Sequence, residues 1–175
     1  MNNNAIIVFG SSRRHGYTGQ LVDEVARRHQ LRIVDVSDYQ MTPYDYEQRN
    51  RDDDFLPLMR EVASYSQIIL ASPVYWYTMS SQLKVFVDRW NDLLTIEKDL
   101  GRTLRGKSGL VISTGGDVRP ERSFAECFMH SFQFMGMSYD GLLYCPTDSG
   151  RSLDLSEHEA AIAAFSQKIY PISPS

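Results

Sequence analysis

Cysteine is scarce in this chain of 175 residues, where Cys127 and Cys145 stand far apart, with no CxxC pair and no histidines gathered beside them. This spacing argues against zinc and iron–sulfur sites, and no metal site is predicted. It also favours a reducing compartment, so we expect a cytoplasmic protein. Both cysteines are then interpreted as small buried hydrophobic residues.

Two further absences narrow the class of partner. The formal net charge is only −4 and no block of basic residues occurs, which disfavours binding to nucleic acid through its phosphates. No apolar stretch approaches the roughly 20 residues that a membrane-spanning helix needs. The first residues, MNNNAIIVFG, have no basic segment before the apolar one. We therefore expect neither a signal peptide nor a membrane partner.

What is present is the composition of an ordinary globular protein. Hydrophobic residues make up 42% of the chain and charged residues 23%, which is typical of soluble domains. The length is sufficient for one sizeable core and short of the length that divides a chain into two. No internal repeat, low-complexity segment or linker interrupts it. We expect residues 1–175 to form a single domain.

Short apolar runs alternate along the chain with segments of helical periodicity. Several runs are apolar at consecutive positions, which is typical of parallel strands covered on both faces. The expected strands are 5–10, 31–36, 67–72, 109–114 and 141–145. The expected helices are 18–29, 54–65, 80–94, 121–135 and 156–169. With right-handed crossovers, this order predicts an α/β fold with a five-stranded, doubly wound parallel sheet.

One connection, residues 37–53, is long for a compact domain. Its sequence is SDYQMTPYDYEQRNRDD, and its length indicates a functional segment, an interface or a mobile loop. The acidic run 52–54 at its end could bind a metal. A capped helix start on a solvated face is the favoured interpretation, with Asp53 or Asp54 as the cap.

Ligands of a doubly wound sheet bind outside the carboxyl ends of its strands, where the winding direction reverses. The first loop there, GSSRRHGYTGQL at 10–21, combines Gly10 and Gly16 with several hydroxyls and two arginines ahead of a helix. The free N–H groups and positive dipole end of a helix start attract anions, so this loop predicts a phosphate cradle. A hydroxyl-capped helix beside a solvated basic loop is the alternative. The loop is neither a Walker A motif nor a GxGxxG motif.

Two further loops could meet a flat ligand. SPVYWYTMSSQLK, at 72–84, begins with a stiff proline and presents three adjacent aromatic rings, which could pack near the face or rim of a ring system. A subunit interface is the alternative place for Trp76 and one tyrosine. STGGDVRPER, at 113–122, has a glycine pair that lets backbone approach a planar ring. A plain strand-to-helix turn is the alternative there.

Together these loops resemble segments of the flavodoxin-like NAD(P)H-dependent FMN reductase family, which includes quinone, azo-dye and nitro-compound reductases. The first resembles the family's GSxRxxGxT phosphate loop, and the second its longer SPVYxxxxxxxLKxFxDR signature. The resemblance extends from residue 5 to about residue 145. It implies a flavodoxin-like sheet with strand order 2-1-3-4-5 and a noncovalently bound FMN.

By this resemblance the first loop would hold the 5′-phosphate of FMN, the second would line the isoalloxazine, and the third would approach its pyrimidine edge. The residues concerned are Ser11, Ser12, Arg13, Gly16, Tyr17 and Thr18, then Pro73, Val74, Tyr75 and Trp76, then Thr114, Gly115 and Gly116. Tyr17 stands where the family often has a smaller or amide side chain. The region between the second and third strands lacks the cysteine cluster of iron–sulfur relatives, which argues against a second redox centre.

The resemblance implies an enzyme that passes hydride from NADPH or NADH through flavin N5 to a small-molecule electron acceptor, such as a quinone, flavin, nitro or azo compound. Because the flavin carries the chemistry, no catalytic side chain is predicted. Family members are usually homodimers or homotetramers, and 37–53 and 121–135 are the expected contacts. Two alternatives stay open: a flavodoxin-type electron carrier without pyridine-nucleotide activity, and a flavin-free regulatory or scaffold domain on the same fold.

Overall fold

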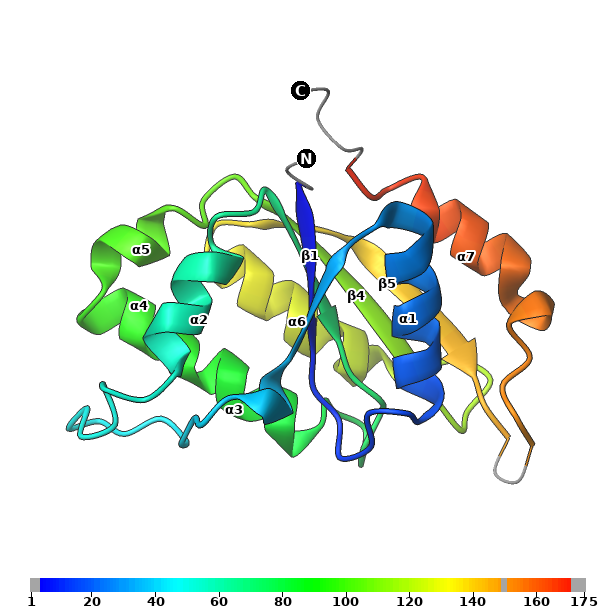
Figure 1. Ribbon diagram of the computed structural model, residues 1–175, viewed down its shortest axis with the longest axis horizontal. Coiled ribbons are helices and arrows are strands. Elements are labelled where there is room, and N and C mark those ends of the chain that lie inside the picture. Colours follow the sequence, from blue (N-terminus) through cyan, green and yellow to red (C-terminus); the bar gives the residue numbers. More distant parts are fainter. Residues whose placement is uncertain (1–3, 149–150, 171–175) are drawn as a thin grey trace.

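The computed structural model describes residues 4–148 and 151–170, and its centre is a five-stranded sheet (Figure 1). The strands are β1 (Ala5–Phe9), β2 (Arg32–Asp35), β3 (Gln67–Ala71), β4 (Ser108–Gly115) and β5 (Ser138–Pro146). Their order is β2-β1-β3-β4-β5, and every neighbouring pair is parallel. The fold class and the strand order expected from the sequence are confirmed.

Helices cover both faces of this sheet. In Figure 1, α1 and α7 lie together on one side and α2 to α6 on the other. The α-helices are α1 (Tyr17–His29), α2 (Phe55–Val62), α3 (Ser81–Asp88), α4 (Asp92–Thr95), α5 (Lys98–Arg102), α6 (Arg122–Phe134) and α7 (Glu159–Ser166). Single 3₁₀ turns are η1 (Val36–Asp38), η2 (Arg89–Asn91) and η3 (Leu155–His158).

Each helix expected from the sequence is present, with two differences in outline. The segment 80–94 is divided into α3, η2 and α4, and the segment 156–169 into η3 and α7. The short helix α5 was not predicted, because five residues are too few to show a helical period. Ser80 caps α3, its hydroxyl accepting a hydrogen bond from the N–H of Leu83 at 3.2 Å.

The continuous apolar runs are explained by burial on both faces of the sheet. All five residues of β1 are fully buried. Ile6 and Val8 belong to the core under α2, α3 and α6, whereas Ile7 and Phe9 belong to the core under α1 and α7. Each such side chain contributes about 1.5–3 kcal/mol to folding. No described helix is long and apolar enough to cross a membrane.

The long segment between η1 and α2 is fastened at its base by the fully buried side chain of Arg89. Arg89 Nη1 donates to Asp53 Oδ2 at 2.5 Å and to the carbonyl of Thr42 at 3.1 Å. Its Nε donates to Asp92 Oδ2 at 2.9 Å, and its guanidinium carbon lies 4.7 Å from the centre of the Phe55 ring. Hydrogen bonds from Arg89 therefore anchor the segment to the start of η2, in addition to its covalent connections to η1 and α2.

Asp53 serves this junction and also starts a helix. Its Oδ1 accepts a hydrogen bond from the N–H of Phe55 at 3.0 Å. Asp54 holds the N-cap position of α2, but its carboxylate accepts a hydrogen bond from the N–H of Gln40 instead of from the helix. Burial alone would raise the pKa of Asp53, but hydrogen bonds from Arg89, Phe55 and Thr42 hold it below its usual value. Within the described residues, no group of His, Cys, Asp and Glu is arranged to hold a metal ion.

Candidate functional site

A cavity of about 410 Å³ lies at the carboxyl edge of the sheet, among the loops that follow β1, β3 and β4. It is lined by Ser11, Ser12, Arg13, Gly16, Tyr17, Thr18, Pro73, Val74, Tyr75, Thr114, Gly115, Gly116 and Thr147. Every site residue expected from the sequence, except Trp76, therefore lines one cavity, and Thr147 is an addition. Its volume is within the usual range for cofactor pockets.

The loop after β1 is packed tightly against the start of α3. The N–H of Gly10 donates to the carbonyl of Ala71 at 2.9 Å, and Ser80 Oγ donates to the carbonyl of Gly10 at 2.7 Å. A Cβ atom at Gly10 would lie 2.7 Å from the backbone nitrogen of Leu83. A glycine is needed here so that two backbones can approach closely, and this contact holds the loop after β1 against the start of α3.

One end of the cavity is rich in hydrogen-bond donors. Helix α1 begins after Gly16, which has no side chain to cap it, and the first turn contains no acidic residue. The N–H groups of this turn therefore face the cavity without an internal anion. The hydroxyl-bearing residues Ser11 and Thr18 are buried beside it, and Ser11 Oγ accepts a hydrogen bond from the N–H of Arg13 at 3.2 Å.

The two adjacent arginines of this loop have different surroundings. Arg14 is engaged with the body of the protein: its Nη2 lies 2.6 Å from Asp23 Oδ1, and its guanidinium carbon lies 5.4 Å from the centre of the Phe9 ring. Arg13 lines the cavity, and its guanidinium forms no hydrogen bond or ion pair with any residue that the structure describes. Arg13 is thus the cation available to a bound anion.

Gly19 in α1, which was not predicted as a site residue, allows the same loop to pack against the helix. A Cβ atom at Gly19 would lie 1.8 Å from the carbonyl oxygen of Arg14, far inside any contact distance. The loop can fold over the first turn of α1 only because this position has no side chain. The sequence signal was a third glycine after Gly10 and Gly16, placed where a helix would ordinarily favour another residue.

The other end of the cavity is formed by backbone. The N–H of Val74 donates to the carbonyl of Thr114 at 2.9 Å, which joins the loops after β3 and β4. A Cβ atom at Gly115 would lie 2.7 Å from the hydroxyl of Tyr144 and 3.1 Å from Val74 Cγ2. At Gly116 the same atom would meet nothing within 4 Å. This wall is therefore built from closely packed backbone, with free space at Gly116 for a ring.

Two aromatic residues of the expected site lie differently from the prediction. Trp76 does not line the cavity, and 92% of its surface is exposed. Tyr17 lines the cavity with its ring, but its hydroxyl donates to the carbonyl of Arg151 at 2.6 Å. That hydroxyl is therefore engaged in holding the loop after β5, rather than free for a phosphate as the sequence suggested. Tyr75 bonds Ser12, their hydroxyl oxygens lying 2.9 Å apart.

Thr147 was not predicted, because only the loops after the first, third and fourth strands were expected to contribute to the site. β5 lies beside β4, and Gly115 pairs with Pro146 at the end of the two strands. The N–H of Thr147 donates to the carbonyl of Gly115 at 2.7 Å. Its place immediately after an edge strand, next to a strand that supplies the site, was the available signal.

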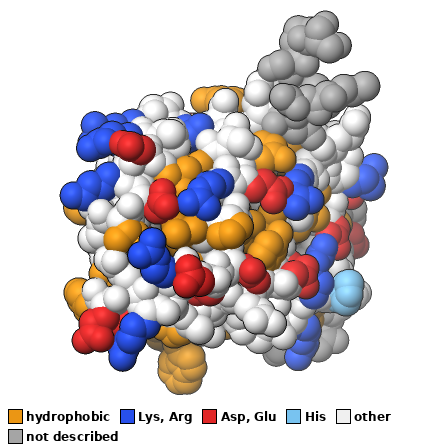
Figure 2. Space-filling view, turned by 60° about the vertical axis from the view of Figure 1, so that its left-hand side comes forward, with side chains coloured by type: hydrophobic (Ala, Val, Ile, Leu, Met, Phe, Trp, Pro, Cys, Tyr) orange, Lys and Arg blue, Asp and Glu red, His pale blue; other side chains and the backbone are white. Residues whose placement is uncertain are grey.

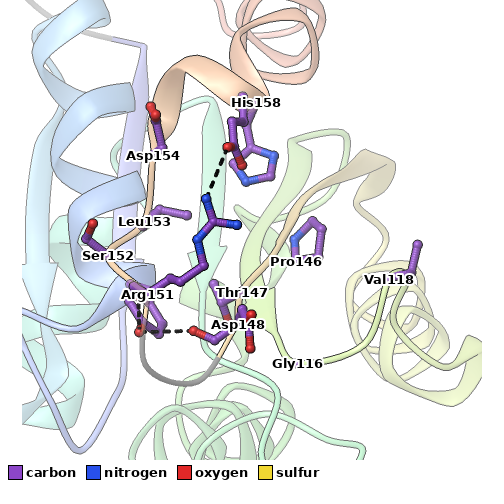
Figure 3. A pocket seen from close by; sticks show the side chains of 12 residues that line it. Gly116, Val118, Pro146, Thr147, Asp148, Arg151, Ser152, Leu153, Asp154 and His158 are labelled. Carbon is purple, nitrogen blue, oxygen red and sulfur yellow. Dashed lines mark hydrogen bonds and ion pairs between the residues drawn. The ribbon is translucent and has the colours of Figure 1, made fainter.

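A second cavity of about 250 Å³ adjoins the first and shares Tyr17, Gly116 and Thr147 with it (Figure 3). It lies between the loop after β5 and the start of η3. Its charges are mixed, with Arg151 and His158 set among three carboxylates, Asp148, Asp154 and Glu157. Since carboxylates outnumber the basic groups, this neighbouring cavity is not an anion cradle, unlike the donor-rich end of the first.

Comparison with known proteins decides what the arrangement is. Residues 4–141 match the family described as NADPH-dependent FMN reductase. The chain belongs to this family. NADPH-dependent FMN reductases are flavoprotein oxidoreductases, so the predicted family, the predicted cofactor FMN and the prediction of an NAD(P)H-dependent enzyme are confirmed.

Individual relatives agree with this assignment. The chain is 29% identical over 169 residues to YwqN of Bacillus subtilis (strain 168), which is named as an NAD(P)H-dependent FMN-containing oxidoreductase; the match covers 90% of this chain and 92% of YwqN. The solved Trp repressor binding protein from Bacillus subtilis is 26% identical with a TM-score of 0.72, covering 95% of this chain and 99% of that one. An FMN-dependent NADH-azoreductase from Bacillus anthracis, solved with FMN, has a TM-score of 0.67 at 11% identity, over 94% and 97% of the two chains; at this identity the likeness concerns the fold.

The cavity fits FMN in both charge and shape. Its donor end combines an uncapped helix start, Arg13 and hydroxyl groups, which is the chemistry that a phosphate requires. At its backbone end, Gly115 lets the chain pack closely against Tyr144 and Val74, and a Cβ atom at Gly116 would meet nothing within 4 Å. A hydrogen bond between Thr18 and Thr114, whose hydroxyl oxygens lie 2.7 Å apart, connects the two ends of the cavity.

Proposed function

We propose that this protein reduces a small planar electron acceptor, such as a quinone, flavin, nitro or azo compound, at the expense of NADPH or NADH. In this proposal the cavity of Ser11 to Thr147 is the FMN site of a single flavin-binding domain. The observation that supports this proposal most strongly is that a single cavity has hydrogen-bond donors suited to a phosphate at one end and a wall of backbone at the other. Separate phosphate and ring sites would not support a flavin nucleotide.

When bound, FMN supplies the capacity to take a hydride and to release electrons one or two at a time. The chain's own residues bind and orient it. Arg13 and the N–H groups at the start of α1 hold the phosphate through charge-assisted hydrogen bonds. Val74 and Gly115 hold the flat part against backbone, and Tyr75, fixed by its bond to Ser12, closes one side.

The backbone wall also has an electrostatic role in this proposal. Oriented N–H dipoles near a redox-active ring stabilise negative charge that develops on it, at no cost in reorganisation. Gly116 lines the cavity, and a Cβ atom there would meet nothing within 4 Å, so a ring can approach this part of the wall. No side chain of the cavity is assigned proton transfer.

The decisive experiment is anaerobic mixing of the FMN-loaded protein with NADPH, and separately with NADH. Loss of the oxidised flavin absorbance within the mixing experiment is expected with at least one of them. An FMN-loaded protein that neither nucleotide bleaches, but that a chemical reductant does, would be an electron carrier instead. A purified protein that fails to quench the fluorescence of added FMN would be the flavin-free domain, and both results contradict the proposal.

We also propose a homodimer or homotetramer with contacts on α6. A groove of about 410 Å³ between α3 and α6 is lined by Val87, Trp90, Leu94, Phe134 and Met135, together with polar residues. Phe134 stands at its edge with 75% of its surface exposed. Figure 2, in which the left-hand side of Figure 1 comes forward, shows hydrophobic side chains between charged ones on that face. Sedimentation velocity tests the proposal, and a monomer at micromolar concentration would contradict it.

We propose that the protein is located in a reducing compartment, and the two cysteines support this proposal. Cys127 and Cys145 are both free, and burial raises the pKa of the Cys145 thiol to about 11. Unpaired cysteines support a reducing environment such as the cytoplasm. Fractionation of the source cells, with the protein detected by antibody, tests this directly, and recovery from an oxidising compartment would contradict it.

A further inference from the structure

The segment after Tyr75 forms a two-residue hairpin turn with two aromatic residues at its tip. The N–H of Tyr75 donates to the carbonyl of Thr78 at 2.9 Å, and the N–H of Thr78 donates back at 3.1 Å. Between them, Trp76 has φ of 47° and Tyr77 has φ of 65°. Positive φ at both central residues is the requirement of a type I′ turn, which Asn-Gly meets with least strain.

Trp76 and Tyr77 are unfavourable residues for this backbone. A positive φ is uncommon for any residue other than glycine and is a genuine outlier for a bulky one. The strain is not offset by burial, because Trp76 is 92% exposed and Tyr77 is 59% exposed. Two large aromatic side chains are thus exposed to solvent on a turn that other residues would form more easily. This indicates that they contact another molecule.

The turn is rigidly joined to the FMN cavity. Tyr75, at its first position, lines the cavity and is bonded to Ser12 of the phosphate loop. After the turn, the N–H of Ser80 donates to Ser72 Oγ at 2.8 Å, so both ends of the 72–80 loop are tied together. Trp76 and Tyr77 therefore stand at the cavity's edge in a defined position.

We propose that Trp76 and Tyr77 determine acceptor specificity by packing against a planar aromatic electron acceptor at the mouth of the cavity. The proposal rests on the proposed function. A cavity of about 410 Å³ accommodates one cofactor-sized ligand, so a second flat molecule must lie at its edge. On the loop after β4, Val118 presents another exposed apolar side chain, 89% accessible. Val118 lines the second cavity, which adjoins this one and shares Gly116 with it, so exposed apolar groups stand on both loops.

The electron balance of such a step is complete. A quinone takes two electrons and two protons to become a hydroquinone. NADPH or NADH supplies both electrons and one proton as a hydride, and water supplies the second proton. Trp76 and Tyr77 take no part in that exchange of electrons and protons. Their contribution is contact area with the flat face of the acceptor.

The test replaces the strained pair with the residues that the turn prefers, Trp76→Asn together with Tyr77→Gly. This variant keeps the turn and removes both rings. Its melting temperature, measured without FMN, is expected to rise by about 2–4 °C because the backbone strain is relieved. Unchanged or lowered stability would overturn the argument from strain. Tyr170→Ala, an exposed aromatic residue beside Gln67 at the amino ends of the strands, is the matched control.

The acceptor measurement uses FMN-loaded protein reduced beforehand with dithionite, so it does not depend on activity with NAD(P)H. Reduced protein is mixed with 2-methyl-1,4-naphthoquinone or with ferricyanide, which has no flat ring. We expect the second-order rate constant for the quinone to fall about tenfold in the double variant. The rate constant for ferricyanide, and both rate constants of Tyr170→Ala, should not change.

Three results would overturn this proposal. An unchanged quinone rate would show that the aromatic pair does not meet the acceptor. An equal loss with quinone and ferricyanide would show a general defect in electron release. A change of sedimentation coefficient in the double variant would assign the pair to a contact with a second copy of the chain. Failure of the proposed function is seen separately, as wild-type flavin that NADPH and NADH do not reduce.

Discussion

The hydroxyls of Thr18 and Thr114 lie 2.7 Å apart and form a buried hydrogen bond between α1 and β4, 96 positions apart in the chain. Both residues line the cavity proposed to hold FMN. One hydroxyl donates to the other, so each is satisfied by its partner even when no ligand is present. This pair fixes the donor-rich end of the cavity relative to its backbone wall.

A double-mutant cycle on this pair measures how much the hydrogen bond contributes to the stability of the fold. Thr18→Val or Thr114→Val alone should lower the free energy of unfolding by about 1–3 kcal/mol, because the remaining hydroxyl is buried without a partner. The double variant should lose less than the sum, since both polar groups are gone. Urea unfolding without FMN measures this. Strictly additive losses would contradict a direct bond between the two hydroxyls.

Arg13 and Arg14 should respond differently to truncation. Arg13→Ala is expected to weaken FMN binding by about 1.5–3 kcal/mol, since it removes a charge-assisted bond to the phosphate. Arg14→Ala should leave the dissociation constant of FMN unchanged and lower stability by less than about 1 kcal/mol, because its pair with Asp23 is partly exposed. Fluorescence titration of FMN compares them. Equal effects on FMN binding would remove Arg13 from the phosphate site.

Gly19→Ala should damage the phosphate loop without touching the ligand. The added Cβ would lie 1.8 Å from the carbonyl oxygen of Arg14, so the loop must move. We expect FMN affinity to fall at least tenfold, even though alanine is the better helix residue by about 1 kcal/mol. Ala26→Gly, in the same helix, is the control: it should cost stability and leave FMN affinity alone. Full FMN affinity in Gly19→Ala would mean that the loop geometry is not needed.

The junction of Asp53 and Arg89 predicts a pH dependence of stability. The folded-state pKa of Asp53 is lowered, so its ionised form adds stability above its ordinary pKa of 3.8, and this is lost as pH falls through the lowered value. Asp53→Asn should lose about 1–3 kcal/mol at pH 7. Its unfolding free energy should also change less than the wild type's between pH 5 and pH 3.

Urea unfolding across that pH interval makes the measurement. Asp52→Asn provides the control, since Asp52 is the exposed neighbour and should follow the wild type. Parallel curves for Asp53→Asn and wild type would show that Arg89 does not depend on this carboxylate. Arg89→Lys should destabilise as well, because an ammonium group cannot reach Asp53, Asp92 and the Thr42 carbonyl together.

The sheet and most of the cavity could be predicted because their signals are local. Strands buried on both faces require runs of apolar residues, and parallel strands bring their carboxyl ends to one edge. The loops at those ends then had to meet, whatever their detailed conformation. That is why the loops that carry Ser11, Val74 and Gly115 could be expected at one edge of the sheet, while the resemblance to the reductase family assigned the individual residues.

The parts that could not be predicted depend on contacts between distant segments. Trp76 points out of the site because the turn at Tyr75 and Thr78 places it in a positive φ, and nothing in an aromatic triplet predicts such a turn. The division of 80–94 at η2 coincides with Arg89, whose partners come from the segment before α2. The clash at Gly19 involves a carbonyl oxygen, which has no sequence signal of its own.

The placement of the two tryptophans gives the protein two separate optical reporters. The chain contains only two; Trp90 is buried against the Phe86 and Phe132 rings, whereas Trp76 stands in water. Emission from Trp90 should follow unfolding, and iodide should quench Trp76 selectively. A flavin in the neighbouring cavity would accept excitation energy from either ring, so cofactor loading and the integrity of the fold can be followed in one cuvette without any added label.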